Sequence, residues 1–459
     1  MSRSKPNQHF SQPKRSGIQV TNQPSASTTT KPGSGKQQGS NQIHYQNYLL
    51  VGIVTLLVGI SVAMVQYKIP TIMTKIMDIF TMNANEASWL MSIFTLVGVF
   101  VSLPAGGLAR RLGPKKPMLI AALFVALGSV IGILAQVGWV LILSRAIEGV
   151  ALTIVTTTGP ILIQRCVSPR NIGSAMGIWG LWGSLGSTLA GVITPTLLEQ
   201  FGFAGIWLIY AALMLLAAMV LMIVIHLPKT IKGTEPAPDD QPMSDHVPAS
   251  QASQASQASQ VSQVPQQQKQ LHYRALITQN TFLFFAGFTA LQICLLAVLA
   301  FVPTRLIGQG FNATLAGFIS TAPMLLAIIS SPLFGVLSDK TGRRKPLLML
   351  SFLVMGPCTF VLYTNNGIGM WIAVFVMGLV GMGGIGVSMA ALIDLLPGPE
   401  YVPMGMGVML LVQSAGQFLG TALVQILLGP TLTDWFFAGM ILMIIGIVGT
   451  LVFAATKLR

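Results

Sequence analysis

The sequence predicts an all-α membrane protein with twelve transmembrane helices in two pseudo-symmetric six-helix bundles. Three observations lead to this prediction: an apolar composition, long apolar runs separated by short loops, and a basic loop that occurs twice. Hydrophobic residues make up 53% of the 459-residue chain, charged residues make up 8%, and the mean hydropathy is +0.71. Because a soluble domain carries roughly 25% charged residues, this composition excludes an ordinary soluble protein.

The apolar runs are each long enough to cross the membrane as a helix, which takes roughly 20 residues. They cover residues 48–72, 88–109, 117–136, 138–164, 172–196 and 204–227, and then 279–303, 313–337, 346–364, 368–395, 403–428 and 434–456. We therefore expect an N-terminal bundle at 47–227 and a C-terminal bundle at 275–459.

Two polar segments accompany these bundles. Residues 1–46 contain Lys and Arg but no Asp or Glu, which predicts a disordered basic arm, and they do not have the pattern of a signal peptide. Residues 228–274 carry a Ser-Gln-Ala repeat at 250–260, which predicts a disordered cytoplasmic linker.

The distribution of Lys and Arg predicts the orientation, because cytoplasmic loops are enriched in them. With both termini in the cytoplasm, the outer side receives only Lys68, Lys75 and Arg305. The cytoplasmic loops then hold Arg110, Arg111, Lys115, Lys116, Arg165, Arg170, Lys340, Arg343, Arg344 and Lys345. This bias predicts a multi-pass protein of the plasma (cytoplasmic) membrane. It also explains the net charge of +14 without a nucleic-acid partner.

The duplicated loop runs from Gly106 to Lys116 and again from Gly335 to Lys345. Both copies read Gly, three residues, Asp or Arg, a cation, one residue, Gly, one residue and two cations. A duplicated loop indicates a duplicated membrane domain, and transporters bind substrate at the interface of such repeats. The defining residues are Gly106, Arg110, Arg111 and Gly113 in the first copy and Gly335, Asp339, Lys340, Gly342 and Arg344 in the second.

With this loop after the second span of each half, residues 47–457 resemble the major facilitator superfamily. The second loop matches the family signature at each defining position, whereas Arg110 replaces the usual Asp in the first. The resemblance implies a secondary transporter, usually monomeric, in which the loops latch one state of an alternating-access cycle. The alternative is that the loops only anchor the topology. The end of the first span loosely resembles cyanate-permease-like members.

The fourth span contains Ser144-Arg145-Ala146-Ile147-Glu148-Gly149, which resembles the Arg-x-x-x-Gly element of the family. Arg145 and Glu148 are three residues apart and share a helical face. Ionisable residues at membrane depth are costly and mark transport pathways or proton relays. Two roles remain open: Arg145 attracts an anion or tunes a proton site at Glu148, or the two form a static ion pair that braces the bundle.

Polar residues in other spans complete the candidate substrate contacts. They are Gln66, Tyr67, Lys68, Gln292, Gln413 and Gln417. Lys68 either supplies positive charge to a cavity or extends to the membrane interface. Gln413 and Gln417 share a helical face, and buried amides serve either a substrate or helix–helix hydrogen bonds.

The charged residues expected inside the membrane are Lys68, Arg145 and Glu148, with no unpaired acid for an organic cation. The sequence therefore predicts ion-coupled transport of a small organic or inorganic anion, with the proton as candidate coupling ion. The alternative is proton-coupled efflux of amphipathic drug-like compounds, which the 24 methionines would also suit. Since nucleotide-loop, metal-ligand and nucleophile patterns are missing from the sequence, we expect neither an enzyme nor a cofactor.

Overall fold

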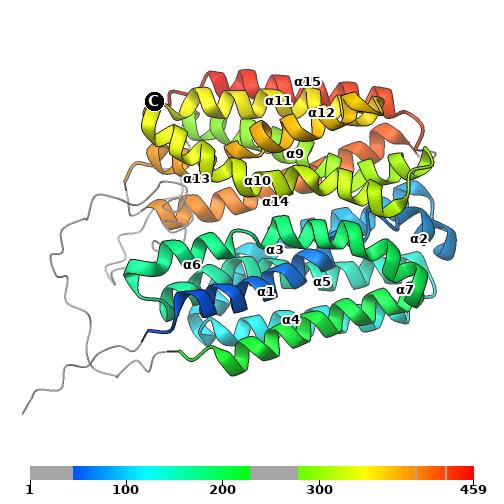
Figure 1. Cartoon of the computed structure of the whole chain (residues 1–459), viewed down its shortest axis with the longest axis horizontal. Coiled ribbons are helices and arrows are strands. Elements are labelled where there is room, and N and C mark those ends of the chain that lie inside the picture. Colours follow the sequence, from blue (N-terminus) through cyan, green and yellow to red (C-terminus); the bar gives the residue numbers. More distant parts are fainter. Residues whose placement is uncertain (1–44, 228–277, 399–400, 430–431, 459) are drawn as a thin grey trace, which may run out of the picture. The chain divides into compact units, whose positions relative to one another are not determined.

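A computed structural model describes residues 45–227, 278–398, 401–429 and 432–458 (Figure 1). Every regular element in these ranges is a helix, which confirms the all-α prediction. The predicted linker, and the predicted basic arm except for its last two residues, lie outside the described residues.

The first half of the chain forms seven α-helices and one 3₁₀ turn. They are α1 (Tyr48–Tyr67), α2 (Met73–Phe80), α3 (Ala84–Leu112), α4 (Lys115–Ile133), α5 (Gly138–Cys166), η1 (Pro169–Asn171), α6 (Ile172–Trp179) and α7 (Trp182–Val224). The elements described in the second half are α9 (Gln279–Gly308), α10 (Ala313–Thr341), α11 (Arg344–Thr364), α12 (Ile368–Val376), η3 (Met377–Gly381), α13 (Gly383–Leu395), α14 (Val402–Leu428) and α15 (Trp435–Ala454).

Eleven stretches of the described chain are long and apolar enough to cross a membrane. One of them, Pro169–Val224, has 56 residues, more than twice what a bilayer requires. Gly202 inside it has a φ of 67°, outside the helical range, and marks a kink between two helices. The α7 ribbon turns back on itself in Figure 1. The fifth and sixth predicted spans are thus joined by a tight glycine turn with no polar loop between them, and a count of twelve stays a prediction.

The tenth predicted span is not a uniform α-helix. A π-helical turn, η3, separates α12 from α13 and disturbs the regular pattern of backbone hydrogen bonds. Two hydroxyls from neighbouring helices donate to carbonyls of this turn: Ser330 Oγ to Gly378 O at 2.9 Å and Ser351 Oγ to Val380 O at 2.8 Å. Side chains of α10 and α11 thus satisfy backbone groups of the turn.

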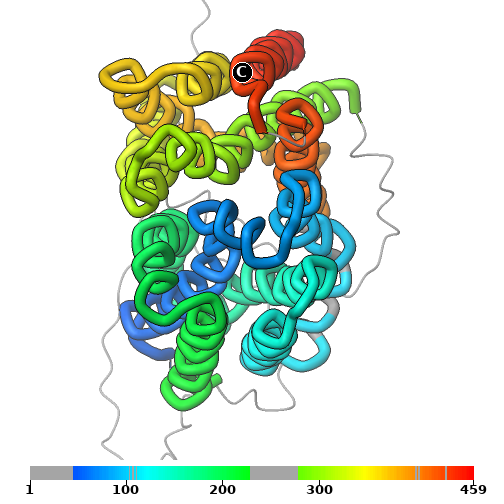
Figure 2. The backbone as a smooth tube through the Cα atoms, turned by 90° about the vertical axis from the view of Figure 1, so that its right-hand side faces the viewer, coloured from blue at the N-terminus to red at the C-terminus, as the bar shows by residue number. Residues whose placement is uncertain are grey.

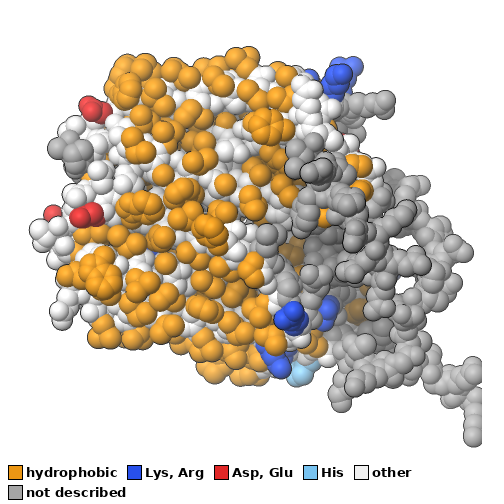
Figure 3. All heavy atoms as spheres, turned by 180° about the vertical axis from the view of Figure 1, so that it is seen from behind, with side chains coloured by type: hydrophobic (Ala, Val, Ile, Leu, Met, Phe, Trp, Pro, Cys, Tyr) orange, Lys and Arg blue, Asp and Glu red, His pale blue; other side chains and the backbone are white. Residues whose placement is uncertain are grey.

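Helices pack mainly within their own half of the chain, as the separate blue-green and yellow-red groups in Figure 2 show. The two halves meet mainly through two helix pairs, α7 with α10 and α3 with α14. Hydrophobic side chains cover most of the visible face between the two ends of the protein, as expected for a surface in contact with lipid (Figure 3).

The two ends of the protein differ in charge. We call the end where α1 begins and α15 ends the basic end, because the loops after α3 and α10 place their Lys and Arg there. The opposite end carries exposed carboxylates, namely Asp78, Glu86, Glu199 and Asp434. Figure 3 shows acidic side chains at one end of the visible face and Lys, Arg and His at the other. The charge asymmetry expected from the sequence is therefore present between the ends of the protein.

Candidate functional site

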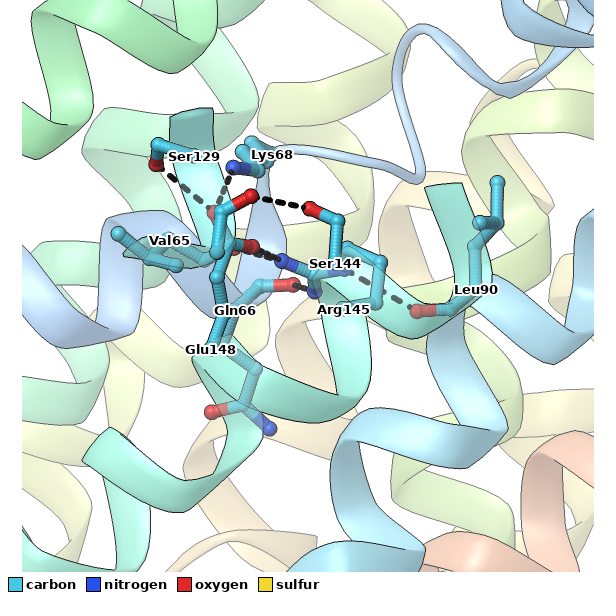
Figure 4. A network of polar contacts seen from close by, with 9 residues as sticks. Val65, Gln66, Lys68, Leu90, Ser129, Ser144, Arg145 and Glu148 are labelled. Atoms are coloured by element: carbon cyan, nitrogen blue, oxygen red, sulfur yellow. Dashed lines mark hydrogen bonds and ion pairs between the residues drawn. The ribbon is translucent and has the colours of Figure 1, made fainter. Parts of the chain in front are cut away.

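Three ionisable side chains of the first half form a buried cluster, drawn in Figure 4. Glu148 on α5 accepts hydrogen bonds from Lys68 Nζ at 2.8 Å and from Arg145 Nη1 at 2.6 Å. Ser129 Oγ on α4 donates to the same carboxylate at 3.0 Å. Lys68, Arg145 and Glu148 are all 0% exposed. We call these three residues the charge cluster; with two cations and one anion, it carries a formal charge of +1.

Arg145 also binds the end of α1. Its Nη1 donates to Val65 O at 2.9 Å, its Nη2 donates to Gln66 O at 3.1 Å, and its Nε donates to Leu90 O on α3 at 3.2 Å. The last carbonyls of a helix lack partners within the helix and attract cations. Arg145 therefore caps the C-terminus of α1 and fastens it to α3 and α5, with its guanidinium 4.3 Å from the ring centre of Phe94.

The Lys68 side chain lies among helices of the first half. Its Nζ lies 4.1 Å from the ring centre of Trp207 on α7, in addition to its bond with Glu148. Each residue for which the structure gives a charge-cluster contact belongs to the first half of the chain. The cluster thus lies between α1, α3, α4, α5 and α7, which all belong to the first half.

Small residues make room for the cluster. A Cβ at Gly128 on α4 would lie 2.6 Å from Glu148 Cγ, so only glycine lets α4 approach α5 this closely. Ser144 Oγ donates to Gly128 O at 2.7 Å and links the same two helices. Sequence reasoning paired Arg145 with Glu148 but missed Lys68, Ser129 and Trp207 as partners, because their meeting depends on helix packing. The one available signal was the small-residue pair at 128–129 in an apolar span.

The other first-span candidates are also buried. Gln66 is 8% exposed and Tyr67 is 7% exposed. The contact that the structure gives to Gln66 is through its backbone carbonyl, which accepts from Arg145. These residues therefore belong to the surroundings of the charge cluster.

In the second half, Gln292 on α9 is 1% exposed, and its Oε1 has no hydrogen-bond partner among the described residues. Gln413 and Gln417 on α14 are half-buried. Gln292 packs against α14, since a Cβ at Gly416 would lie 2.8 Å from Gln292 Cβ. The structure thus brings Gln292 next to the helix of the other two amides and separates all three from the charge cluster.

The duplicated loops end their helices with glycines at positive φ, Gly113 at 75° and Gly342 at 61°. The cations that follow bind their own half: Lys115 Nζ donates to Met222 O at 2.9 Å, and Lys345 Nζ donates to Thr456 O at 2.8 Å. Arg344 pairs with Asp394 at 2.8 Å. Of the remaining loop positions, Gly335 is buried, whereas Arg111, Asp339 and Lys340 are exposed; Gly106 and Arg110 lie within α3.

Contacts between the halves lie toward the opposite end. Ser92 Oγ on α3 donates to Thr421 Oγ1 on α14 at 2.8 Å, and the rings of Trp89 and Phe418 have centres 6.4 Å apart. Gln425 Nε2 donates to Asn85 O at 2.8 Å, nearer still to the end of the bundle. The α3–α14 pair is therefore closed from its middle to the opposite end.

The second helix pair is joined by glycines. A Cβ at Gly317 on α10 would lie 2.0 Å from Gly191 O on α7, so the two backbones are in direct contact. Ser187 Oγ on α7 lies 3.2 Å from the Met324 sulfur on α10. Both helix pairs, α3–α14 and α7–α10, are thus closed toward the end opposite the basic end.

This all-helical architecture, with eleven stretches able to cross a membrane in its described part, is that of a multi-pass membrane transporter. The model of the Major Facilitator Superfamily matches residues 51–421 and 281–459, and the chain belongs to this family. Members of the family are transporters and not enzymes.

Curated relatives are similar over part of their length. The galactose-proton symporter of Escherichia coli K12 is 25% identical over 193 residues, 42% of this chain and 40% of the symporter. The arabinose-proton symporter of the same strain is 26% identical over 170 residues, 37% of this chain and 34% of the symporter. Methyl viologen resistance protein SmvA of Salmonella typhimurium LT2 is 27% identical over 135 residues, 29% of this chain and 27% of SmvA. The chain thus matches about two fifths or less of these relatives.

Proposed function

We propose that this protein is a secondary transporter that couples the movement of a small polar solute to a proton gradient. Membership of the superfamily and the similarity to two sugar-proton symporters support the reaction type. The observation that carries the proposal is the one-sided contact between the halves. A transporter that alternates between two open states needs an interface that closes at one end while the other separates.

The conformation supports this mechanism. On α14, the face that meets α3 at Ser414, Phe418 and Thr421 continues one turn toward the basic end to Leu410, which is 36% exposed. The hydrogen bonds given for the basic-end cations Lys115 and Lys345 remain within one half each. We infer that the halves separate toward the basic end, so that substrate exchanges there in this state.

The charge asymmetry supports an orientation with the basic end in the cytoplasm. The described structure is then the inward-facing state of a plasma-membrane transporter with both termini inside. We propose a monomer as the working unit, because one chain supplies both halves of the interface.

An anionic substrate, as the sequence predicts, is the second candidate. The observation that favours it is the formal charge of +1 on the charge cluster. Against it, Lys68 and Arg145 already bind partners of the first half. The comparisons give no support to the cyanate-permease-like subfamily, and similarity to SmvA covers too little of the chain to favour drug efflux.

Glu148 is the candidate proton site, because it is the one fully buried carboxylate in the described part of the chain. It accepts three hydrogen bonds in this state, a set suited to an ionised carboxylate. To take up a proton it would have to release Lys68 or Arg145. Proton binding at this site would therefore loosen the contact between α1 and α5.

The test uses the full chain in proteoliposomes on a solid-supported membrane, which reports charge movement without labelled substrate. The panel contains D-galactose, L-arabinose, xylitol, lactate, benzoate and methyl viologen. We expect saturable currents with at least one solute that depend on the pH gradient and disappear with a protonophore or in empty liposomes. Lactate and benzoate are followed by labelled uptake, because one proton carried with one monocarboxylate moves no net charge. Uptake that vanishes in Lys68→Met would establish the anion candidate. Transport that ignores the pH gradient would contradict proton coupling.

A further inference from the structure

The second half holds a buried amide that has no partner for its oxygen. Gln292 Oε1 is fully enclosed, yet no described donor reaches it. More than nine in ten buried polar groups in proteins are hydrogen-bonded, and leaving one unpaired in an apolar interior is costly. Gln292 lies among apolar residues in the middle of α9, where leucine would fit the surroundings better. Packing alone therefore leaves this acceptor unsatisfied in the described state.

Two further amides lie beside it on α14. Successive residues of a helix are about 100° apart around its axis. Ser414, Phe418 and Thr421 face α3, Gly416 and Gly420 face α9, and the exposed Leu419 and Ile426 face outward.

Around the axis of α14, Gln413 and Gln417 lie between the face that meets α9 and the face that meets α3. This position is roughly opposite the outward face. They therefore point into the space shared by the two halves. Both are half-buried, and the described residues offer neither side chain a hydrogen bond. Because Gln292 packs on Gly416, the three amides occupy one junction of α9 and α14.

The charges around this junction decide what it can bind. Among the charged side chains described in the second half, Arg305 is the one that is buried, at 4% exposed. It lies near the opposite end of α9 and donates to Leu362 O at 3.0 Å. The amide junction thus has neither a counter-ion for an anion nor a carboxylate for a cation. An amide offers one acceptor and two donors, and a hydroxyl group can satisfy either side of it.

We propose that Gln292, Gln413 and Gln417 form the substrate contact of the second half and bind an uncharged solute with several hydroxyl groups. This inference rests on the proposed transport function and makes it specific. The position suits the function, because the half-buried Gln413 and Gln417 lie on the basic-end side of the Ser92–Thr421 closure, toward the end where the halves separate. Gln292 is enclosed in this state and packs against the same stretch of α14. Gln292 receives its missing donor only when the solute is bound.

The test compares Gln292→Leu and Gln413→Leu with the wild type and with Gln309→Leu, a matched control at the exposed end of α9. Transport of D-galactose, L-arabinose and xylitol is measured with the panel and membrane described above. We expect the KM of the transported solute to rise about tenfold or more in both junction variants, from the loss of hydrogen bonds to the substrate, and to stay unchanged in Gln309→Leu.

Thermal unfolding of the purified, solute-free protein is the second readout. Leucine at 292 removes an unpaired polar atom, so Gln292→Leu should unfold at a temperature equal to or above that of the wild type. An amide that only holds α9 to α14 would give the reverse: a lower unfolding temperature and an unchanged KM. That result would overturn the proposal.

The outcomes distinguish failure of the substrate site from failure of proton-coupled transport. Proton-linked uptake of lactate or benzoate alone would leave proton-coupled transport standing and overturn the hydroxylated substrate. Wild-type KM in both junction variants would overturn the site. A wild-type protein with no proton-linked response to any solute would overturn the proposed function and this inference with it.

Discussion

Replacing Glu148 by Gln should destabilise the protein far more than replacing Lys68 by Met, although both changes break the same ion pair. Glu148 is the one anion of the charge cluster, so its loss leaves Lys68 and Arg145 buried with no counter-ion. Leaving an uncompensated charge in this way costs about 3–5 kcal/mol of the free energy of unfolding. We expect Glu148→Gln to fall in that range.

Lys68→Met has a different consequence. It leaves the 2.6 Å pair of Arg145 and Glu148, which is neutral overall, and it leaves Arg145 bound to the carbonyls of α1 and α3. Methionine can pack against Trp207 in place of the lysine stem. A buried ion pair can be replaced by an apolar group at little cost, so we expect a loss of about 1.5 kcal/mol at most.

The double variant Lys68→Met/Glu148→Gln makes the comparison stricter. It should be more stable than Glu148→Gln alone, because one of the two unpaired cations is gone. Such a gain is the non-additivity expected of residues in direct contact.

The assay follows unfolding of the purified protein with a thiol-reactive fluorescent dye. It suits this chain because all three of its cysteines, Cys166, Cys294 and Cys358, are buried in the folded protein. Equal losses of stability in Lys68→Met and Glu148→Gln would refute the reasoning. Further loss in the double variant would refute it as well.

Two other predictions concern the contact between the halves and the duplicated loops. Gly317→Ala places a Cβ 2.0 Å from Gly191 O, so it should open the closed end and lengthen spin-label distances measured across it, whereas Gly183→Ala, whose nearest side-chain atom is 3.7 Å away, should not. Unchanged distances in Gly317→Ala would contradict a closure made by the two glycines. Lys115→Met and Lys345→Met should each lower stability by about 1 kcal/mol in the dye assay, because each removes a cation from the carbonyl end of a helix. A neutral effect of both would reduce the loops to topology anchors.

The sequence alone predicted the membrane class, because apolar runs of bilayer length leave few alternatives. It also predicted the duplicated organisation from the two basic loops. It did not show the glycine turn at Gly202 or the π-helical turn at Met377–Gly381. The first depends on a positive φ that glycine adopts readily, and the second on hydroxyls that neighbouring helices supply; an apolar run displays neither.

The candidate site was predictable only as a set of residues. The spacing of Arg145 and Glu148 placed them on one helical face, and the same argument paired Gln413 with Gln417. Which helix each face meets is a property of the packed bundle. Only the tertiary structure placed Lys68 on Trp207 inside the first half, and only it placed Gln292 beside Gly416 of α14.

These placements argue against the hypothesis that the charged residues bind the substrate. From the sequence, the charged residues were the strongest substrate candidates, because charge in a membrane is costly and marks function. In the folded protein, the charge cluster satisfies itself within one half, whereas the described residues give Gln292 Oε1 no hydrogen-bond partner. Composition and periodicity determine that this chain is a membrane helix bundle. Which polar groups are left free for a solute is decided by packing, because a hydrogen bond requires its two partners to meet in space.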